Sequence, residues 1–121
     1  MAVCLIVDDD DLSCEMSSHT IMSLGISTTI KTDSVEALTW CARNMPDLIL
    51  LDIRMPKIDG FAFIKAFHKI PNSENTKIIA STGLCDVATV HKLKTERVSG
   101  YLVKPYSMDA LKERVAQLKL Y

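Results

Sequence analysis

The fold can be inferred outward from residues 48–56, which read LILLDIRMP. Four aliphatic residues in a row (48–51) are followed by Asp52 and, four positions later, by Pro56. A strand that is apolar on both faces is typical of the middle of a parallel sheet, where helices cover each side. Asp52 would then lie at the carboxyl end of that strand, the edge of an open α/β sheet where ligands bind. Asp52 alone leaves open the alternative of a carboxylate that only ends a strand and begins a turn.

The composition describes a chain that can form a core of its own. Its 121 residues predict one domain, 1–121, and a chain of this size buries roughly two-thirds of its unfolded surface. A hydrophobic content of 48% with four prolines and four glycines excludes a disordered or collagen-like chain. The net charge of −1 gives no reason to expect direct contact with nucleic acid or with an acidic membrane. We expect no membrane span and no signal peptide, because the apolar start is short and ends at four aspartates.

The four cysteines stand singly along the sequence, at Cys4, Cys14, Cys41 and Cys85. None belongs to a Cys-x-x-Cys pair, and no histidine cluster lies at zinc spacing. Isolated cysteines of this kind are usually small buried hydrophobic residues. The pattern therefore predicts a reduced, cytoplasmic protein rather than a disulfide framework.

Apolar runs alternate with segments of helical periodicity along the whole chain. Alternation at this spacing predicts right-handed βαβ units, and hence an α/β domain with a parallel sheet between two helical layers. The expected strands are residues 3–7, 26–31, 47–51, 77–81 and 101–103. The expected helices are residues 11–24, 34–44, 60–69, 86–96 and 108–119.

The first expected helix has only a weak apolar stripe, formed by Met16, Thr20, Ile21 and Leu24, with Gly25 as its stop. The third expected helix carries phenylalanines at helical spacing, which favour a core position over a cofactor site.

Four of the five expected strands end in a chemically distinctive group. Asp8 and Asp9 follow the first strand, Asp52 the third, Thr82 the fourth and Lys104 the fifth. In a parallel sheet these groups would gather at one edge. Three neighbouring carboxylates repel one another, and their charged forms need a compensating cation. An all-oxygen set of this kind suits Mg²⁺.

The same groups supply what phosphoryl transfer needs. Asp52 could accept a phosphoryl group as an acyl phosphate, and Lys104 could pair with Asp52 at rest and hold a phosphate oxygen later. The Thr82 hydroxyl could donate to the new group, and Mg²⁺ would offset its charge. Alternatively, the acids 8–11 only begin a helix and Lys104 only lies at the surface. A chance gathering of all these groups at one edge is the less favoured reading.

With these residues in place, the whole chain resembles the receiver domain of two-component response regulators. An Asp-Asp pair alone would be weak support, but an ordered set of four motifs is specific. The matching motifs are residues 7–9 (VDD), 51–56 (LDIRMP) with Asp59-Gly60 downstream, 81–83 (STG) and 100–105 (GYLVKP). The resemblance implies a flavodoxin-like, doubly wound, five-stranded parallel sheet of order 2-1-3-4-5 with five helices.

The resemblance also implies a role for each acidic residue of the site. Asp52 would be the phospho-acceptor. Asp8, Asp9 and Asp52, together with the backbone carbonyl of Arg54, would hold Mg²⁺.

Three further residues would respond to the phosphoryl group. Thr82 would be the switch hydroxyl, Tyr101 the aromatic side chain that follows it inward, and Lys104 the phosphate-binding lysine. The resemblance implies a cis peptide bond between Lys104 and Pro105.

The function implied is a cytoplasmic signalling switch that catalyses only its own phosphorylation and dephosphorylation. A sensor histidine kinase or a histidine phosphotransfer protein would supply the phosphoryl group. The face formed by the fourth helix, fifth strand and fifth helix would then change its preferred effector. A homodimer, the cognate kinase and the output are left open.

The sequence departs from the family pattern in two places, one beside Asp52 and Thr82 and one at the end of the fourth expected helix. Arg54 and Leu84 flank the path of water to an acyl phosphate, so we expect them to alter the dephosphorylation rate. Residues 94–98 (KTERV) replace the usual small residues and glycine.

The sequence disfavours three other functions. A phosphatase of the haloacid dehalogenase type needs an acid where Arg54 stands. A receiver that no longer accepts phosphate would not keep the complete set of acids, Thr82 and Lys104. A flavin-binding flavodoxin is disfavoured by the acidic loop after the first strand.

Overall fold

The computed structural model describes residues 2–54, 59–83 and 87–120. Within these ranges strands and α-helices alternate five times, with one 3₁₀ helix, η1 (Ser73–Asn75), before the fourth strand. The strands are β1 (Val3–Val7), β2 (Ser27–Lys31), β3 (Leu48–Asp52), β4 (Lys77–Thr82) and β5 (Gly100–Val103). The helices are α1 (Asp11–Met22), α2 (Ser34–Arg43), α3 (Gly60–His68), α4 (Val87–Thr95) and α5 (Met108–Ala116). In the part of the chain described, no helix is long and apolar enough to cross a bilayer.

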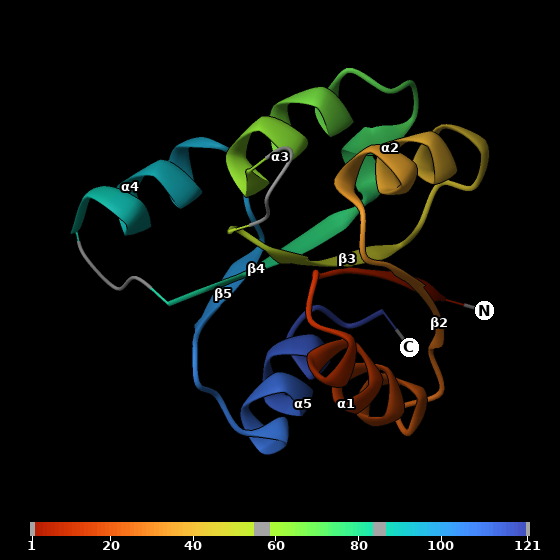
Figure 1. Ribbon diagram of the computed structural model, residues 1–121, viewed down its shortest axis with the longest axis vertical. Helices are drawn as coiled ribbons and strands as arrows, with labels where there is room; N and C mark the ends of the chain where they lie inside the picture. The colour runs from red at the N-terminus through yellow and green to blue at the C-terminus, as the bar shows by residue number, and fades with distance from the viewer. Residues whose placement is uncertain (1, 55–58, 84–86, 121) are drawn as a thin grey trace.

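All neighbouring strands pair in parallel, in the order β2-β1-β3-β4-β5, which confirms the predicted topology. Helices α1 and α5 cover one face of the sheet, and α2, α3 and α4 cover the other (Figure 1). The register aligns the strand ends, since Val7 lies opposite Leu51 and Asp52 lies opposite Ser81. The carboxyl ends of β1, β3 and β4 therefore meet at one edge of the sheet.

The central strands send alternate side chains into two separate cores, which explains why the sequence is apolar at every position there. In β3, Ile49 and Leu51 enter the core beneath α2 and α3, whereas Leu48 and Leu50 enter the core beneath α1 and α5. The phenylalanines Phe63 and Phe67 of α3 are fully buried in the first of these cores, as predicted.

Polar residues fix the start of four helices, as N-caps normally do. The side chains of Asp10 and Asp33 accept hydrogen bonds from backbone amides in the first turns of α1 and α2. Asp59 and Ser107 do the same for α3 and α5, accepting from Ala62 N at 2.9 Å and from Ala110 N at 3.0 Å.

The predicted stripe of α1 is wrong in part. Ile21 is buried, but Met16 is 49% exposed. The helix buries Cys14, Ser17 and Ser18 instead. The stripe is rotated toward small polar side chains, of which Cys14 finds a polar partner in the Asp8 carbonyl and Ser18 finds one in the Thr28 hydroxyl.

Two loops have a constrained backbone position, one beside the site and one before β5. A Cβ added at Gly60 would lie 2.5 Å from the Cα of Ile53, so only glycine allows α3 to begin this close to the end of β3. Arg97 adopts a left-handed conformation (φ 59°) after α4, within the segment that departs from the family pattern. A non-glycine residue there is strained, because its Cβ crowds the backbone.

Candidate functional site

Three carboxylates meet where β1 and β3 end. One carboxylate oxygen each from Asp8, Asp9 and Asp52 lies within 4.8 Å of the others. Asp8 and Asp52 are 7% and 6% exposed, whereas Asp9 is exposed. The structure thus brings together acids that are more than forty residues apart in sequence, as the parallel topology predicts.

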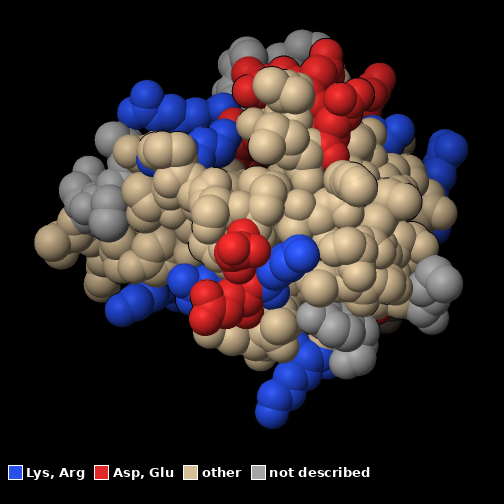
Figure 2. All heavy atoms as spheres, turned by 90° about the horizontal axis from the view of Figure 1, so that it is seen from below, with Lys and Arg blue, Asp and Glu red and all other residues tan. Residues whose placement is uncertain are grey.

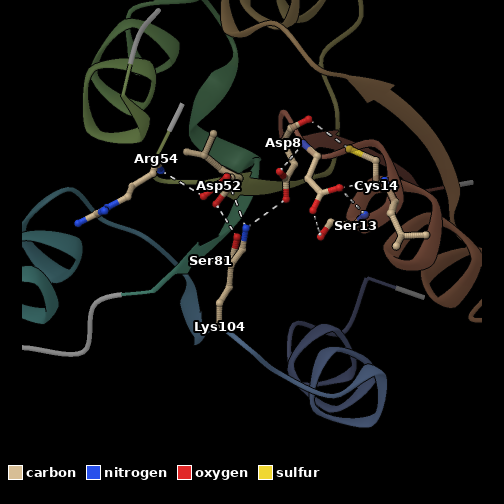
Figure 3. A network of polar contacts seen from close by, with 10 residues as sticks. Asp8, Ser13, Cys14, Asp52, Arg54, Ser81 and Lys104 are labelled. Atoms are coloured by element: carbon tan, nitrogen blue, oxygen red, sulfur yellow. Dashed lines mark hydrogen bonds and ion pairs between the residues drawn. The ribbon is translucent and has the colours of Figure 1, made fainter. Parts of the chain in front are cut away.

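Lys104 reaches the acids from the loop between β5 and α5. Its Nζ lies 3.4 Å from Asp8 Oδ2 and 3.4 Å from Asp52 Oδ2, so one ammonium bridges both carboxylates (Figure 3). The backbone N–H of Lys104 donates to the carbonyl of Thr82 at 2.7 Å. The peptide bond between Lys104 and Pro105 is cis.

The surroundings oppose the charged form of Asp52. Burial raises the pKa of this carboxyl, and the charge of Asp8 raises it further. A hydrogen bond from the Arg54 amide (3.1 Å) and the ammonium of Lys104 lower it, but the pKa remains above its ordinary value. An additional cation would stabilise the ionised site.

The two carboxylates in turn favour the charged form of Lys104. Burial lowers the pKa of its ammonium, but the charges of Asp52 and Asp8 raise it by more, so the pKa lies above its ordinary value. Lys104 is therefore a permanent cation at the edge of the sheet.

The donor set fits a hard divalent cation. Asp8, Asp9 and Asp52 offer oxygen ligands only, with no sulfur or imidazole among them. Mg²⁺ prefers such ligands and commonly combines one or two carboxylates with waters and a phosphate. These three residues could hold Mg²⁺ at the point where their oxygens converge.

The two expected switch residues lie on β4 and β5. Thr82 is 2% exposed at the end of β4, one residue beyond the partner of Asp52 in the register. Tyr101 pairs with Ala80 and packs, partly buried, against the core beneath α2 and α3. Thr82 thus neighbours Asp52, while Tyr101 lies one strand farther out.

Some contacts at this edge are not evident from the sequence. The Cys14 thiol donates to the carbonyl of Asp8 at 3.3 Å, and Ser81 Oγ donates to the carbonyl of Leu51 at 3.4 Å. Cys4, Cys14 and Cys41 are buried as predicted. The only sequence feature that could have indicated the contact between Cys14 and the Asp8 carbonyl is the place of Cys14 in the first turn of the helix that follows Asp8.

Arg54 is exposed, and its side chain extends away from the carboxylates of Asp8 and Asp52 (Figure 3). Leu84, the other residue expected to alter the dephosphorylation rate, lies outside the described residues, as do Met55, Pro56 and Cys85.

Comparison with known proteins agrees with this fold. Residues 4–116 match the family model of the response regulator receiver domain. The probable C4-dicarboxylate response regulator DctR of Halalkalibacterium halodurans is 35% identical over 115 residues, which cover 93% of this chain and 49% of DctR. The cyclic di-GMP phosphodiesterase response regulator RpfG of Xanthomonas campestris is 31% identical over 116 residues, which cover 94% of this chain and 31% of RpfG. The chain thus spans half or less of these two relatives.

Solved structures of similar size give the same result. The chemotaxis protein CheY4 of Vibrio cholerae superposes with a TM-score of 0.90 at 30% identity, over 97% of this chain and 98% of CheY4. The receiver domain of the Francisella response regulator 1452 superposes with a TM-score of 0.86 at 33% identity, over 98% and 96% of the two chains. The chain belongs to the response regulator receiver domain family of two-component signalling, whose members act as signalling switches rather than as conventional enzymes.

Proposed function

We propose that this domain accepts a phosphoryl group on Asp52 in a reaction that requires Mg²⁺. The observation that supports the proposal is the convergence of Asp8, Asp9 and Asp52 within 4.8 Å beside the ammonium of Lys104. Mg²⁺ bound by these acids and by the backbone carbonyl of Arg54 would neutralise charge on the transferring group.

The chain's own residues perform the transfer. An Oδ atom of Asp52 attacks the phosphorus of a phosphohistidine and forms an O–P bond. The P–N bond breaks, and its electron pair returns to the imidazole of the donor. Lys104, released in part from Asp52, pairs with a phosphoryl oxygen, and the Thr82 hydroxyl donates to another. Loss of the group follows when water attacks the acyl phosphate.

The consequence is a shift between two states of the domain. The phosphoryl group adds about −1.5 to −2 charges and new acceptor oxygens. Thr82 and Lys104 turn toward it, Tyr101 moves inward, and the face formed by α4, β5 and α5 changes its affinity for an effector. The proposed donor is a sensor histidine kinase or a histidine phosphotransfer protein in the cytoplasm.

The test is phosphorylation by acetyl phosphate, followed by intact mass spectrometry. We expect wild-type protein with Mg²⁺ to gain the mass of one phosphoryl group, and to gain none after removal of divalent cations with EDTA. Asp52→Asn should remain unlabelled. Asp109→Asn, which removes an exposed acid on α5, is the matched control and should be labelled at the wild-type rate.

Labelling of Asp52→Asn at the wild-type rate would place the acceptor elsewhere and refute the proposal. Steady release of phosphate from a small phosphate ester, with turnover beyond one equivalent, would instead support a phosphatase.

A further inference from the structure

The turn between β1 and α1 carries four consecutive aspartates, at positions 8–11, and the first two belong to the acidic site. Seen from the side of α1 and α5, the molecule has its densest group of acidic side chains at one rim (Figure 2). Neighbouring carboxylates repel one another, so their charges oppose a compact turn. The convergence of Asp8 and Asp9 with Asp52 within 4.8 Å therefore needs contacts that fix this turn.

Hydrogen bonds hold the residues on both sides of Asp9. The backbone N–H of Asp8 donates to the carbonyl of Lys31 on β2 at 3.3 Å, and Asp8 Oδ1 accepts from the N–H of Asp10 at 3.0 Å. Cys14 adds two contacts from the first turn of α1. Its N–H donates to the carbonyl of Asp10 at 3.0 Å, and its thiol donates to the carbonyl of Asp8 at 3.3 Å.

The thiol contact acts on the peptide unit that joins Asp8 to Asp9. Because a peptide unit is planar, fixing the direction of its C=O also limits where the Cα of Asp9, and hence its carboxylate, can lie. Asp9 is exposed, so burial does not hold its side chain. The thiol itself is held firmly, since Cys14 is 1% exposed in the core beneath α1 and α5. Figure 3 shows it directed from α1 toward Asp8.

We propose that the Cys14 thiol positions Asp8 and Asp9 for Mg²⁺ by fixing the peptide unit between them. The inference rests on the Mg²⁺ site of the proposed function and adds one positioning residue to it. Cys14 acts through the backbone of Asp8 and is not itself a ligand, because Mg²⁺ takes oxygen ligands. A cysteine that only fills space in the core would have no such effect on the cation.

The size of the effect follows from the strength of the contact. Loss of a hydrogen bond that orients a metal ligand typically weakens metal binding by roughly 10- to 100-fold. A thiol is a weak donor, and this one acts on the backbone rather than on a carboxylate. We therefore expect a smaller loss of affinity, of about three- to tenfold.

The test compares three variants with wild type. Cys14→Ala removes the thiol, whereas Cys14→Ser keeps a hydrogen-bond donor at the same position. Cys41→Ala is the matched control, because it removes the same sulfur from a fully buried position of α2, in the core on the other face of the sheet.

Two quantities are measured without any phosphodonor. The first is the dissociation constant of Mn²⁺, obtained from the electron paramagnetic resonance signal of the free ion, and that of Mg²⁺, obtained by competition. Mn²⁺ suits the same oxygen ligands. The second is hydrogen exchange of the Asp9 and Asp10 amides in metal-free protein, measured by NMR.

Cys14→Ala should raise both dissociation constants about three- to tenfold and should speed exchange of the Asp10 amide, which donates to Asp8. Cys14→Ser should bind both ions more tightly than Cys14→Ala does, and Cys41→Ala should bind them as wild type does. A purely structural role would lower the unfolding midpoints of Cys14→Ala and Cys41→Ala without changing the metal affinity of the folded protein. Equal affinity in wild type and Cys14→Ala, an equal loss in Cys41→Ala, or no recovery in Cys14→Ser would overturn the inference.

Metal positioning and phosphorylation can fail separately. Wild-type protein that binds Mg²⁺ but is not labelled by acetyl phosphate would refute the proposed function and leave the role of Cys14 standing. Wild-type protein that binds neither Mn²⁺ nor Mg²⁺ would overturn the role of Cys14.

Discussion

Helices α1 and α4 differ in how they are attached to the sheet. Helix α1 buries four side chains, and its buried polar groups contact the β1–α1 loop and β2. Of the nine residues of α4, all of them described, only Leu93 is buried. Among the contacts of α4, Lys92 Nζ lies 4.2 Å from the centroid of the Phe61 ring. The chain just after α4 is held by a 3.3 Å contact between His68 Nε2 and the Glu96 carbonyl.

The difference corresponds to two tasks within one domain. Under the proposed function, the side that holds Asp8 and Lys104 keeps its geometry for the chemistry, and the Cys14 thiol of α1 supports the loop after β1. The side beyond Thr82 then changes when Asp52 is modified, and α4 buries only one side chain among its described residues. Regions that move are expected to have few buried contacts.

The largest effect should come from truncating the buried apolar anchor of α1. Ile21 is 0% exposed, so Ile21→Ala should cost about 2–5 kcal/mol in the free energy of unfolding, as buried Ile→Ala changes do. Urea unfolding measures this cost. A loss below about 1 kcal/mol would contradict the view that α1 is firmly anchored.

The matched change on α4 should cost less. Leu93→Ala removes the one buried side chain of this helix, but α4 can detach while the sheet stays folded. We expect a global loss of about 1–2 kcal/mol and much faster hydrogen exchange across residues 87–95. The comparison would be broken if Leu93→Ala were as destabilising as Ile21→Ala and the exchange of α4 were no faster.

Asp52→Asn should stabilise the domain at neutral pH in the absence of Mg²⁺. Because the pKa of Asp52 is raised, the folded state binds more protons than the unfolded state in the interval above the ordinary value of 3.8. This carboxyl therefore lowers stability as the pH rises through that interval, and the loss persists at pH 7. We expect a gain of about 1 kcal/mol at pH 7 that shrinks as the pH falls through that interval toward 3.8, measured by thermal unfolding. A gain independent of pH would exclude this cause.

The smallest effect concerns the strained residue after α4. Arg97→Gly removes the clash of a Cβ in the left-handed conformation and should stabilise the domain by about 0.5–1 kcal/mol. Arg97→Ala, which keeps a Cβ, is the control and should not reproduce the gain. Equal unfolding midpoints in urea for all three proteins would show that this strain is not relieved by glycine.

The sequence predicts the structure best where a residue pattern has a single physical cause. Residues 48–51 had to be a central strand because they are apolar on both faces, and the parallel topology then required Asp8 and Asp52 to meet. The polar stripe of α1 could not be predicted in this way. Ser18 is buried because its hydroxyl shares a hydrogen bond with Thr28, and that partner lies on β2, ten residues away in sequence.

The conformation of Arg97 was equally hidden. The sequence shows that residues 96–99 contain no glycine, but it does not say which residue there adopts positive φ. Hydrophobic periodicity carries no information about such a position.

The most direct test of this account is amide hydrogen exchange with and without Mg²⁺ and beryllofluoride, which mimics a phosphoryl group on Asp52. The account predicts changed exchange in α4 and β5 with little change in α1, and no response in Asp52→Asn. Equal responses in α1 and α4, or a full response in Asp52→Asn, would contradict it.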